Sequence, residues 1–377
     1  MKIFHCGHCD QLVFFENTTC VNCGHVLAYL PDQENLGTLE PDGEDRWRSL
    51  STADGIEERA YRLCKNDRDE DVCNWAVPVD DSNPYCLSCR LTRIIPDLSR
   101  PGDRAAWARL EASKRRLIYS LLRLDLPLAS KMEDPQGGLA FEFLADPDPG
   151  TPGAVPVLTG HDGGVITINV AEADDAERER RRHQMHEPYR TILGHFRHEI
   201  GHYYWDRLIK DSEWIDAFRG LFGDEREDYD QAIKRHHEQG APADWPASFV
   251  SAYASSHPWE DWAESWAHYL HIVDNLETAV ECGLSLRPRR KGEPAMKPDI
   301  ALDGQRTTSF DQIISRWFPL TYVLNNLNRG MGLPDAYPFV LSTPALDKLR
   351  FIHEVVGAAA SRVPTGEASE LARPTKG

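Results

Sequence analysis

Apolar residues recur at the three- and four-residue spacing of helices in several long segments. Residues 188–209 predict one buried helix that begins at Pro188, because proline suits the first helical turn. A second helix is predicted from Pro258, with acidic residues in its first turn. Its apolar stripe consists of Trp259, Trp262, Trp266 and Leu270. A third helix is predicted over residues 103–124.

Shorter segments have the pattern of strands. Residues 141–144, 155–159 and 165–170 alternate or cluster their apolar side chains, and the glycines at 160, 163 and 164 predict a turn between the last two. Residues 310–360 have a helical pattern again, with loops at 330–338. The predicted fold class is therefore α+β: a mainly helical domain with a small sheet.

Within the first predicted helix lies the run His198-Glu199-Ile200-Gly201-His202, an HExxH pattern. Side chains four residues apart on a helix differ by roughly 40° around its axis, so both imidazoles can hold one metal ion. Glu199 lies beside them, where it could take a proton from a metal-bound water. Two histidine ligands and a general base are the catalytic residues of a zinc hydrolase.

A hydrolytic zinc needs a third protein ligand and an open position for water. A metzincin would carry a histidine at the position of Leu208, so that class is excluded. In the second predicted helix, Glu260 and Glu264 lie four residues apart. We interpret Glu260 as the third zinc ligand and Glu264 as an acceptor for the N–H of a ligand histidine. Glu264 and Asp206 remain alternative third ligands.

The two segments together resemble the glutamate-zincins, thermolysin's relatives, in which a second helix with E-x-x-A-[D/E] follows HExxH. The spacing is most similar to that of the anthrax-lethal-factor type, with HExGH, then S-x-Y and a glutamate seven residues after the tyrosine. The matching residues in the second segment are Ser251, Tyr253, Glu260, Ala263 and Glu264. This resemblance implies that Tyr253 reaches the active site and hydrogen-bonds the oxyanion or the zinc-bound water.

The whole chain, with its cysteine-rich start, also resembles a bacterial family of zinc-binding metallopeptidases with an N-terminal zinc ribbon. That likeness implies a class and no substrate. In zincins a sheet edge beside the active helix aligns the substrate backbone, and residues 165–170 are our candidate for that strand. The span between His202 and Glu260 is much longer than in thermolysin.

Simpler interpretations stand beside these. His198 and His202 could be ordinary histidines of a polar face, and the two glutamates solvated charges at a helix start, which attracts acids anyway. Tyr253 could be a core tyrosine. His195 is interpreted as structural, since one helix usually supplies two histidines per metal. His257, His268 and His271 could bind substrate, although lone histidines are more often structural.

Nine cysteines are present, and four of them form two CxxC pairs near the start of the chain: Cys6, Cys9, Cys20 and Cys23. Two such turns close one four-thiolate zinc site. A segment of about thirty residues buries too little apolar surface to fold unaided, so the metal would supply the missing stability. We predict a zinc ribbon over residues 1–30.

A second cysteine group has irregular spacing: Cys64, Cys73, Cys86 and Cys89. It could form a second four-thiolate site in a module at 60–95, or two packed thiols and an unrelated CxxC. Cys282 is expected to be a buried small residue. Zinc is favoured over disulfides because Met1 leads straight into the first CxxC pair without the apolar stretch of a signal peptide, which predicts a cytoplasmic protein.

The charge and composition of the chain argue against two kinds of partner, nucleic acids and membranes. The net charge of −18 argues against nonspecific nucleic-acid binding, and no apolar run is long enough for a membrane span. Residues 31–59 are acidic and turn-rich and are interpreted as a linker, 96–363 as the zincin-like domain with a charged helical insert at 223–240, and 364–377 as a disordered tail.

The leading hypothesis is a zinc-dependent endopeptidase that cleaves peptides or proteins, with one catalytic and one or two structural zinc ions, hence about three ions per chain if both cysteine groups bind metal. In it, Glu199 is the general base and Tyr253 supports the oxyanion. One alternative is a catalytically silent adaptor for protein partners. The other is a nucleic-acid-associated regulator that acts through the ribbons.

Overall fold

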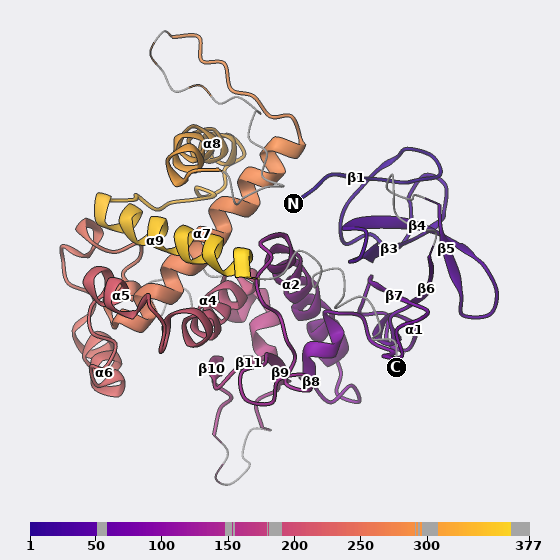
Figure 1. Ribbon diagram of the computed structural model, residues 1–377, viewed down its shortest axis with the longest axis horizontal. Coiled ribbons are helices and arrows are strands. Elements are labelled where there is room, and N and C mark those ends of the chain that lie inside the picture. Colours follow the sequence, from indigo (N-terminus) through magenta and orange to yellow (C-terminus); the bar gives the residue numbers. More distant parts are fainter. Residues whose placement is uncertain are drawn as a thin grey trace.

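The structure is a computed structural model that describes residues 1–50, 59–147, 155–178, 191–290 and 308–362, with Gly153, Arg180, Gly292 and Ala295. Strands gather in the N-terminal part and in a small second sheet, and long helices form the rest (Figure 1). The predicted α+β class is therefore confirmed. The predicted tail at 364–377 and the predicted helix start at Pro188 lie outside the described residues.

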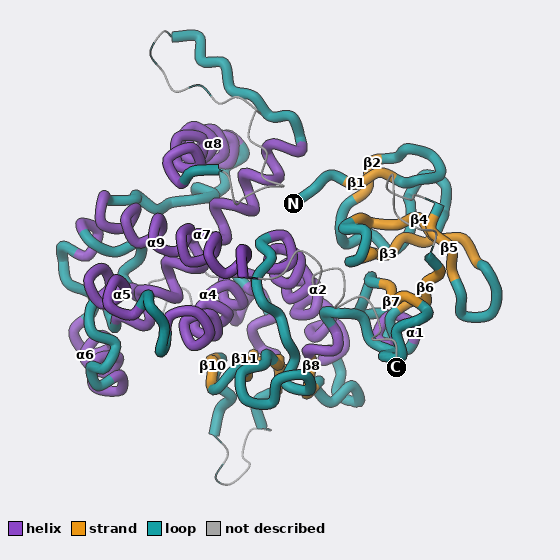
Figure 2. The backbone as a smooth tube through the Cα atoms, in the orientation of Figure 1, coloured by secondary structure: helices purple, strands orange, loops and turns teal. Residues whose placement is uncertain are grey.

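The N-terminal part contains a short hairpin and a five-stranded antiparallel sheet (Figure 2). The hairpin pairs β1 (Phe4–His5) with β2 (Leu12–Val13). The sheet has the order β3 (Val26–Leu30), β4 (Asn35–Pro41), β5 (Trp47–Ser49), β6 (Ala60–Leu63) and β7 (Ala76–Pro78). A short helix, α1 (Lys65–Arg68), and a 3-10 turn (Cys89–Leu91) complete this part.

The interpretation of residues 31–59 as a linker is wrong for their described portion. Its strands β4 and β5 pair with β3 and β6, so one sheet runs across both predicted boundaries. Its turn residues end strands instead of marking an unstructured segment: Glu34, in the turn between β3 and β4, has a φ of 46°. Composition alone could not separate a hairpin-rich segment from a linker, because both are rich in Pro, Gly and Asp.

A second sheet has the strand order β10 (Gly160–Asp162), β11 (Val165–Asn169), β9 (Ala140–Leu144) and β8 (Thr92–Ile94). Strands β9 and β11 match the predicted segments, and β11 runs on into a 3-10 turn, Val170–Ala173. The predicted strand at 155–159 is wrong, because the strand of this hairpin begins at Gly160. The tight turn itself comprises Gly163 and Gly164, which have φ values of 52° and 86°.

This order also corrects the choice of edge strand. Residues 165–170 were expected to align a substrate, but β11 pairs with β10 on one side and β9 on the other, so its backbone is already engaged. Among the described residues, the outer edge of the sheet on that side belongs to β10. Phe196 of the HExxH helix packs on this sheet, with its ring 5.7 Å from that of Phe141 and 6.3 Å from that of Phe143.

Helices build most of the remainder. They are α2 (Asp103–Arg123), α4 (Ile192–Tyr204), α5 (Ile215–Phe222), α6 (Tyr229–Gln239), α7 (Pro258–Glu281), α8 (Phe310–Gly330) and α9 (Thr343–Arg362). The predicted starts of α2 and α7 are confirmed, and α6 occupies the predicted charged insert. Short 3-10 turns at Trp245–Ala247 and Tyr253–Ser255 connect α6 to α7.

The HExxH helix begins later than predicted. Thr191 has extended backbone angles, and its hydroxyl accepts a hydrogen bond from the Gly194 N–H at 2.9 Å, so it caps a helix that begins at Ile192. Threonine is a favoured N-cap, and its extended backbone ends the helix at this residue. At its other end α4 runs into a π-helical turn, Trp205–Ile209.

Helices α4 and α7 cross at very close range. A Cβ added to Gly201 would lie 3.0 Å from Ala263 Cα and 3.1 Å from Trp266 Cβ, so only glycine fits this crossing without a shift. The Trp262 indole N–H donates to the Gly201 carbonyl at 2.8 Å. This contact fixes the HExxH motif of one helix against the glutamates of the other.

Candidate metal centre

Helix α4 directs its two motif histidines to one point. His202 is buried and His198 nearly so, and their Nε2 atoms lie 3.2 Å apart. The Trp259 ring packs against His202 at 3.9 Å between ring centroids, which holds that imidazole in place. The one-turn spacing therefore brings the two imidazoles together as the sequence predicts.

Helix α7 supplies a carboxylate to the same point. Glu260 is almost fully buried, and its Oε2 lies 3.0 Å from His198 Nε2 and 3.5 Å from His202 Nε2. One ligand atom from each of the three residues lies within 4.8 Å of the others. Of the other two candidate third ligands, Asp206 pairs with Lys210 and Glu264 contacts the far side of His198.

Glu264 contacts His198 through the other ring nitrogen. His198 Nδ1 donates to Glu264 Oε1 at 2.7 Å, and Ser251 Oγ donates to Glu264 Oε2 at 2.6 Å. A proton fixed on Nδ1 leaves the Nε2 lone pair free for a metal ion. Ser251 also accepts the Ala254 N–H at 3.1 Å, which anchors the turn that carries Tyr253.

The electrostatics of the group favour a cation. Burial lowers the pKa of His198, but the carboxylates of Glu260 and Glu264 outweigh burial and raise it well above its ordinary value. Burial likewise raises the pKa of Glu260, but His202 and His198 outweigh it and lower that pKa well below its usual range. Two nitrogens and one carboxylate oxygen, facing each other in a buried space, are the donor set that zinc prefers. The residues present therefore fit a zinc ion.

Two further residues named by the sequence lie at this group. Glu199 is largely buried on α4 between the two histidines. The Tyr253 ring lies 6.0 Å from that of His198, and burial, followed by the charge of Glu260, raises its pKa well above the ordinary value. Tyr253 is therefore a neutral hydrogen-bond donor beside the group.

Sequence reasoning missed Tyr229. Its hydroxyl donates to Glu260 Oε1 at 2.6 Å, and burial followed by the charge of Glu260 raises its pKa. The tyrosine is the first residue of α6, and its partner follows 31 residues later, so no local spacing could have linked the two.

The edge strand brings another unpredicted side chain near the group. The ring of His161, on β10, lies 6.3 Å from those of both His202 and Trp259. Its Nε2 accepts the Gly164 N–H at 3.0 Å, and burial lowers its pKa to about 3. His161 is therefore neutral, and its position in a glycine-rich turn gave no sequence signal.

The remaining histidines near these helices have other partners. His195 lies 3.3 Å from Glu172, His257 caps α7 by accepting the Trp259 N–H, and His268 Nδ1 lies 2.6 Å from the Tyr337 hydroxyl. His271 contacts the buried Arg197. None of them belongs to the metal-type cluster of the described residues, as expected for His195.

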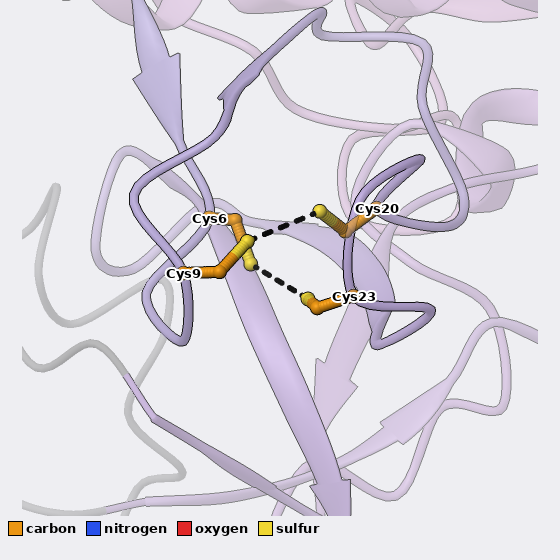
Figure 3. Close-up of side chains that lie close together, drawn as sticks. All are labelled: Cys6, Cys9, Cys20 and Cys23. Carbon is orange, nitrogen blue, oxygen red and sulfur yellow. Dashed lines mark hydrogen bonds between the residues drawn. The ribbon is translucent and has the colours of Figure 1, made fainter.

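The side chains of the first four cysteines point toward one another from two turns of the ribbon (Figure 3). Sγ of Cys6 lies 3.5 Å from that of Cys23, and Sγ of Cys9 lies 3.7 Å from that of Cys20. Gly24, directly after the second pair, has a φ of 76°, which the turn requires. The arrangement suits one tetrahedral ion.

The second cysteine group also converges, although its spacing is irregular. Cys64 lies between β6 and α1, and Cys73, Cys86 and Cys89 follow from the segments around β7. All four are buried, with Sγ atoms 3.7 Å apart for Cys73 and Cys86 and 3.6 Å apart for Cys73 and Cys89.

None of the nine cysteines forms a disulfide, and all lie in the described part of the chain. Cys282 is exposed, so the expectation that it is buried is wrong: it caps the end of α7, where the helix runs out into solvent.

The described residues thus contain three groups of side chains that could each hold a metal ion: His198 with His202 and Glu260, and the two four-cysteine groups. A family model described as "Putative zinc-binding metallo-peptidase" matches residues 103–355, and a zinc-ribbon domain model matches residues 3–100. The chain belongs to this metallopeptidase family and carries a zinc ribbon before its metallopeptidase domain. The single ribbon match spans both cysteine groups, which the sequence had suggested as separate modules.

The chain also resembles mycobacterial proteins over nearly its whole length. A protein of Mycobacterium tuberculosis and one of Mycobacterium bovis are each 44% identical to it over 361 residues, which is 96% of this chain and 96% of the relative. Both are named only as uncharacterized proteins. No solved structure matches the chain. Within the described residues, none of the helices combines the length and apolarity that a membrane span requires.

Proposed function

We propose that the protein is a zinc-dependent endopeptidase with a zincin-like centre, in spacing closest to the anthrax-lethal-factor type. The observation that carries this proposal is the meeting of His198, His202 and Glu260 within 4.8 Å, with Glu199 and Tyr253 at the same place. A structural zinc site would be closed by a fourth protein ligand, whereas no fourth metal-type ligand joins this cluster in the described part of the chain.

The residues divide the chemistry among them. A zinc ion held by His198, His202 and Glu260 would lower the pKa of a water at its open position to about 7 and polarise the scissile carbonyl. Glu199 takes the proton of the attacking water and delivers it to the leaving amine. Tyr253 donates a hydrogen bond to the developing oxyanion, a contribution of about 3 kcal/mol. Glu264 keeps His198 in the tautomer that presents Nε2 to the metal.

The substrate class follows from the same geometry. The free edge of β10 can pair with an extended peptide backbone beside α4, which would align a peptide or protein segment at the centre. The net charge of −18 speaks against a nucleic-acid substrate. We also propose that both four-cysteine groups hold structural zinc and that the chain works in the reducing cytoplasm, because none of the nine cysteines is in a disulfide.

The test is a Glu199→Gln variant of the full chain, assayed on a broad peptide library with and without a chelator. Loss of the general base should lower kcat by about 10²–10⁴-fold and leave the zinc content unchanged, because Glu199 is not a ligand. The wild type and the variant are compared for zinc by elemental analysis. Equal cleavage by both would refute the role of Glu199, and no chelator-sensitive cleavage by the wild type would favour the adaptor alternative.

A further inference from the structure

The two oxygens of Glu260 have separate partners. Oε2 faces the Nε2 atoms of His198 and His202, at 3.0 and 3.5 Å, while Oε1 accepts a hydrogen bond from the Tyr229 hydroxyl at 2.6 Å. A hydrogen bond of this length to a buried carboxylate is charge-assisted and about twice as strong as a neutral one. It holds the carboxylate plane so that one oxygen, and not both, points at the histidines.

The start of α7 holds Tyr229 in this position. His257, the N-cap of α7, accepts the Trp259 N–H on Nδ1 at 3.1 Å, so its Nε2 carries the proton and donates to the Glu227 carbonyl at 3.2 Å. The Tyr229 ring lies 5.2 Å from the His257 ring and 5.9 Å from the Trp259 ring. The helix end that carries Glu260 therefore also anchors the hydrogen-bond donor of Glu260.

The rest of α6 does not explain the position of the phenol. Ala232 is the one fully buried residue of this helix, and the Tyr229 side chain is 38% exposed. A tyrosine kept for core packing would be buried, with its hydroxyl satisfied elsewhere. Here the ring is partly in solvent and the hydroxyl is directed at a buried carboxylate.

The two tyrosines of the centre have different tasks. Tyr229 gives its only hydroxyl proton to Glu260, so it has none left to donate to a substrate oxygen. The Tyr253 ring lies 6.0 Å from that of His198, where its hydroxyl can donate to a substrate oxygen, whereas Tyr229 remains committed to the carboxylate.

We propose that Tyr229 is a positioning residue of the metal centre, which keeps Glu260 as a one-oxygen zinc ligand. This rests on the metal centre of the proposed function but not on its peptidase activity. Loss of a residue that hydrogen-bonds to a metal ligand typically lowers metal affinity by about 10–100-fold. Without the phenol, Glu260 Oε1 loses its buried donor and the carboxylate is free to rotate.

The experiment measures zinc affinity of the full chain in the Tyr229→Phe variant, by competition with a chelator too weak to strip the cysteine groups. We expect about 10–100-fold weaker binding of one ion per chain, with unchanged thermal stability of the zinc-saturated protein. Cobalt placed at this site should show shifted d–d bands, and saturating zinc should restore activity. Unchanged affinity and an unchanged cobalt spectrum would overturn the proposal.

Two matched variants separate this role from a general effect of losing a hydroxyl. Tyr322→Phe removes a hydroxyl from a tyrosine on α8 that is 72% exposed and should leave zinc affinity unchanged. Tyr253→Phe should lower kcat while affinity falls less than threefold. A loss of affinity in Tyr253→Phe as large as that in Tyr229→Phe would assign the effect to the pair of hydroxyls and overturn the separate role.

The outcomes also separate this inference from the proposed function. Weaker zinc binding in Tyr229→Phe, together with a wild type that cleaves no peptide, would support the positioning role and refute the peptidase. A wild type that cleaves peptides, together with a variant that binds zinc normally, would support the peptidase and refute the positioning role. A wild type that holds no ion outside the cysteine groups would overturn both.

Discussion

Glu264 shows how a single residue can set the chemistry of a neighbour. Its two oxygens are engaged by His198 Nδ1 at 2.7 Å and Ser251 Oγ at 2.6 Å, so the carboxylate cannot turn. A fixed acceptor at Nδ1 keeps the His198 proton away from Nε2, the nitrogen that faces His202 and Glu260. The glutamate one turn after the proposed ligand therefore controls the basicity and the orientation of a different ligand.

We expect Glu264→Ala to weaken zinc binding at this centre by about 10–100-fold. The effect arises because His198 loses its acceptor and Ser251 its partner. Glu264→Gln should retain most of the affinity, since an amide oxygen can still accept from Nδ1 and its NH₂ can donate to Ser251 Oγ. Chelator competition distinguishes the two variants, and equal affinities for both would contradict the role assigned to the acceptor.

At the residue scale, the sequence predicts which side chains of one helix lie together. It does not predict which side chains a distant segment adds to the site. His198 and His202 are one turn apart, and Glu260 and Glu264 repeat that spacing, so helical geometry alone groups them. Tyr229 and His161 come from a separate helix and a strand edge, and their approach depends on tertiary packing that no local period encodes.

At the scale of elements, the crossing of α4 and α7 joins the two halves of the centre. Gly201 lies between the motif histidines and faces Ala263, which lies between Glu260 and Glu264. Both positions are small, so the helix backbones approach closely enough for side chains one turn away to meet. The glycine within HExGH is thus explained by packing and needs no catalytic role.

A Gly201→Ala variant should be destabilised by about 1–3 kcal/mol, because its Cβ would lie 3.0 Å from Ala263 Cα and the helices would have to separate. The same separation should weaken zinc binding. Chemical denaturation and zinc competition measure the two effects.

Gly357→Ala is the matched control, since this glycine lies inside α9 with nothing within 4 Å of an added Cβ. There the substitution should stabilise by up to about 1 kcal/mol, the helix-propensity gain. Should Gly201→Ala match the control, close packing would not be the reason for the glycine.

Periodicity predicted the long helices, whereas it missed the strands β4 and β5, predicted a strand at 155–159 that does not form, and gave no sheet order. The long apolar stripes gave α2 and α7 with their starts, because proline and acidic residues mark helix N-termini. Thr191 ended the backward extension of α4 through a side-chain cap, and β10 replaced the expected segment at the sheet edge. Both outcomes depend on which of several neighbouring residues or segments forms the helix cap or the edge strand. The pattern within one segment does not reveal this.

At the scale of the whole molecule, the ribbon is a structural part of the helical domain. Arg123 of α2 bridges Glu34 of the ribbon at 2.6 Å and Glu277 of α7 at 2.9 Å. The Phe15 ring of the ribbon lies 5.5 Å from that of Tyr119 on α2, within one continuous apolar cluster. In Figure 1, α2 lies between the strands β1–β7 and the helices α4–α9.

The second cysteine group lies directly at this junction. Arg115 of α2 donates to the Val72 carbonyl, next to Cys73, at 2.7 Å. Burial lowers the pKa of this guanidinium, but Cys73 and Glu111 lead the interactions that raise it above its ordinary value. Four thiolates around a divalent ion carry a net negative charge, which a buried cation from α2 would offset. Metal bound at this group would therefore stabilise the contact between the ribbon and α2.

Stripping zinc from the cysteine groups should consequently destabilise the helices as well. Each tight site contributes on the order of 4 kcal/mol, so chelation should lower the Tm of the whole chain by on the order of 10 °C. Calorimetry of Glu260→Ala, which lacks a ligand of the proposed catalytic site, isolates the effect of the cysteine groups. The ribbon and the helices share one apolar cluster. We therefore expect one broad unfolding transition, whose Tm shifts for the whole chain. An unmoved main transition, with a separate small one lost on chelation, would mean that the ribbon and the helices fold independently.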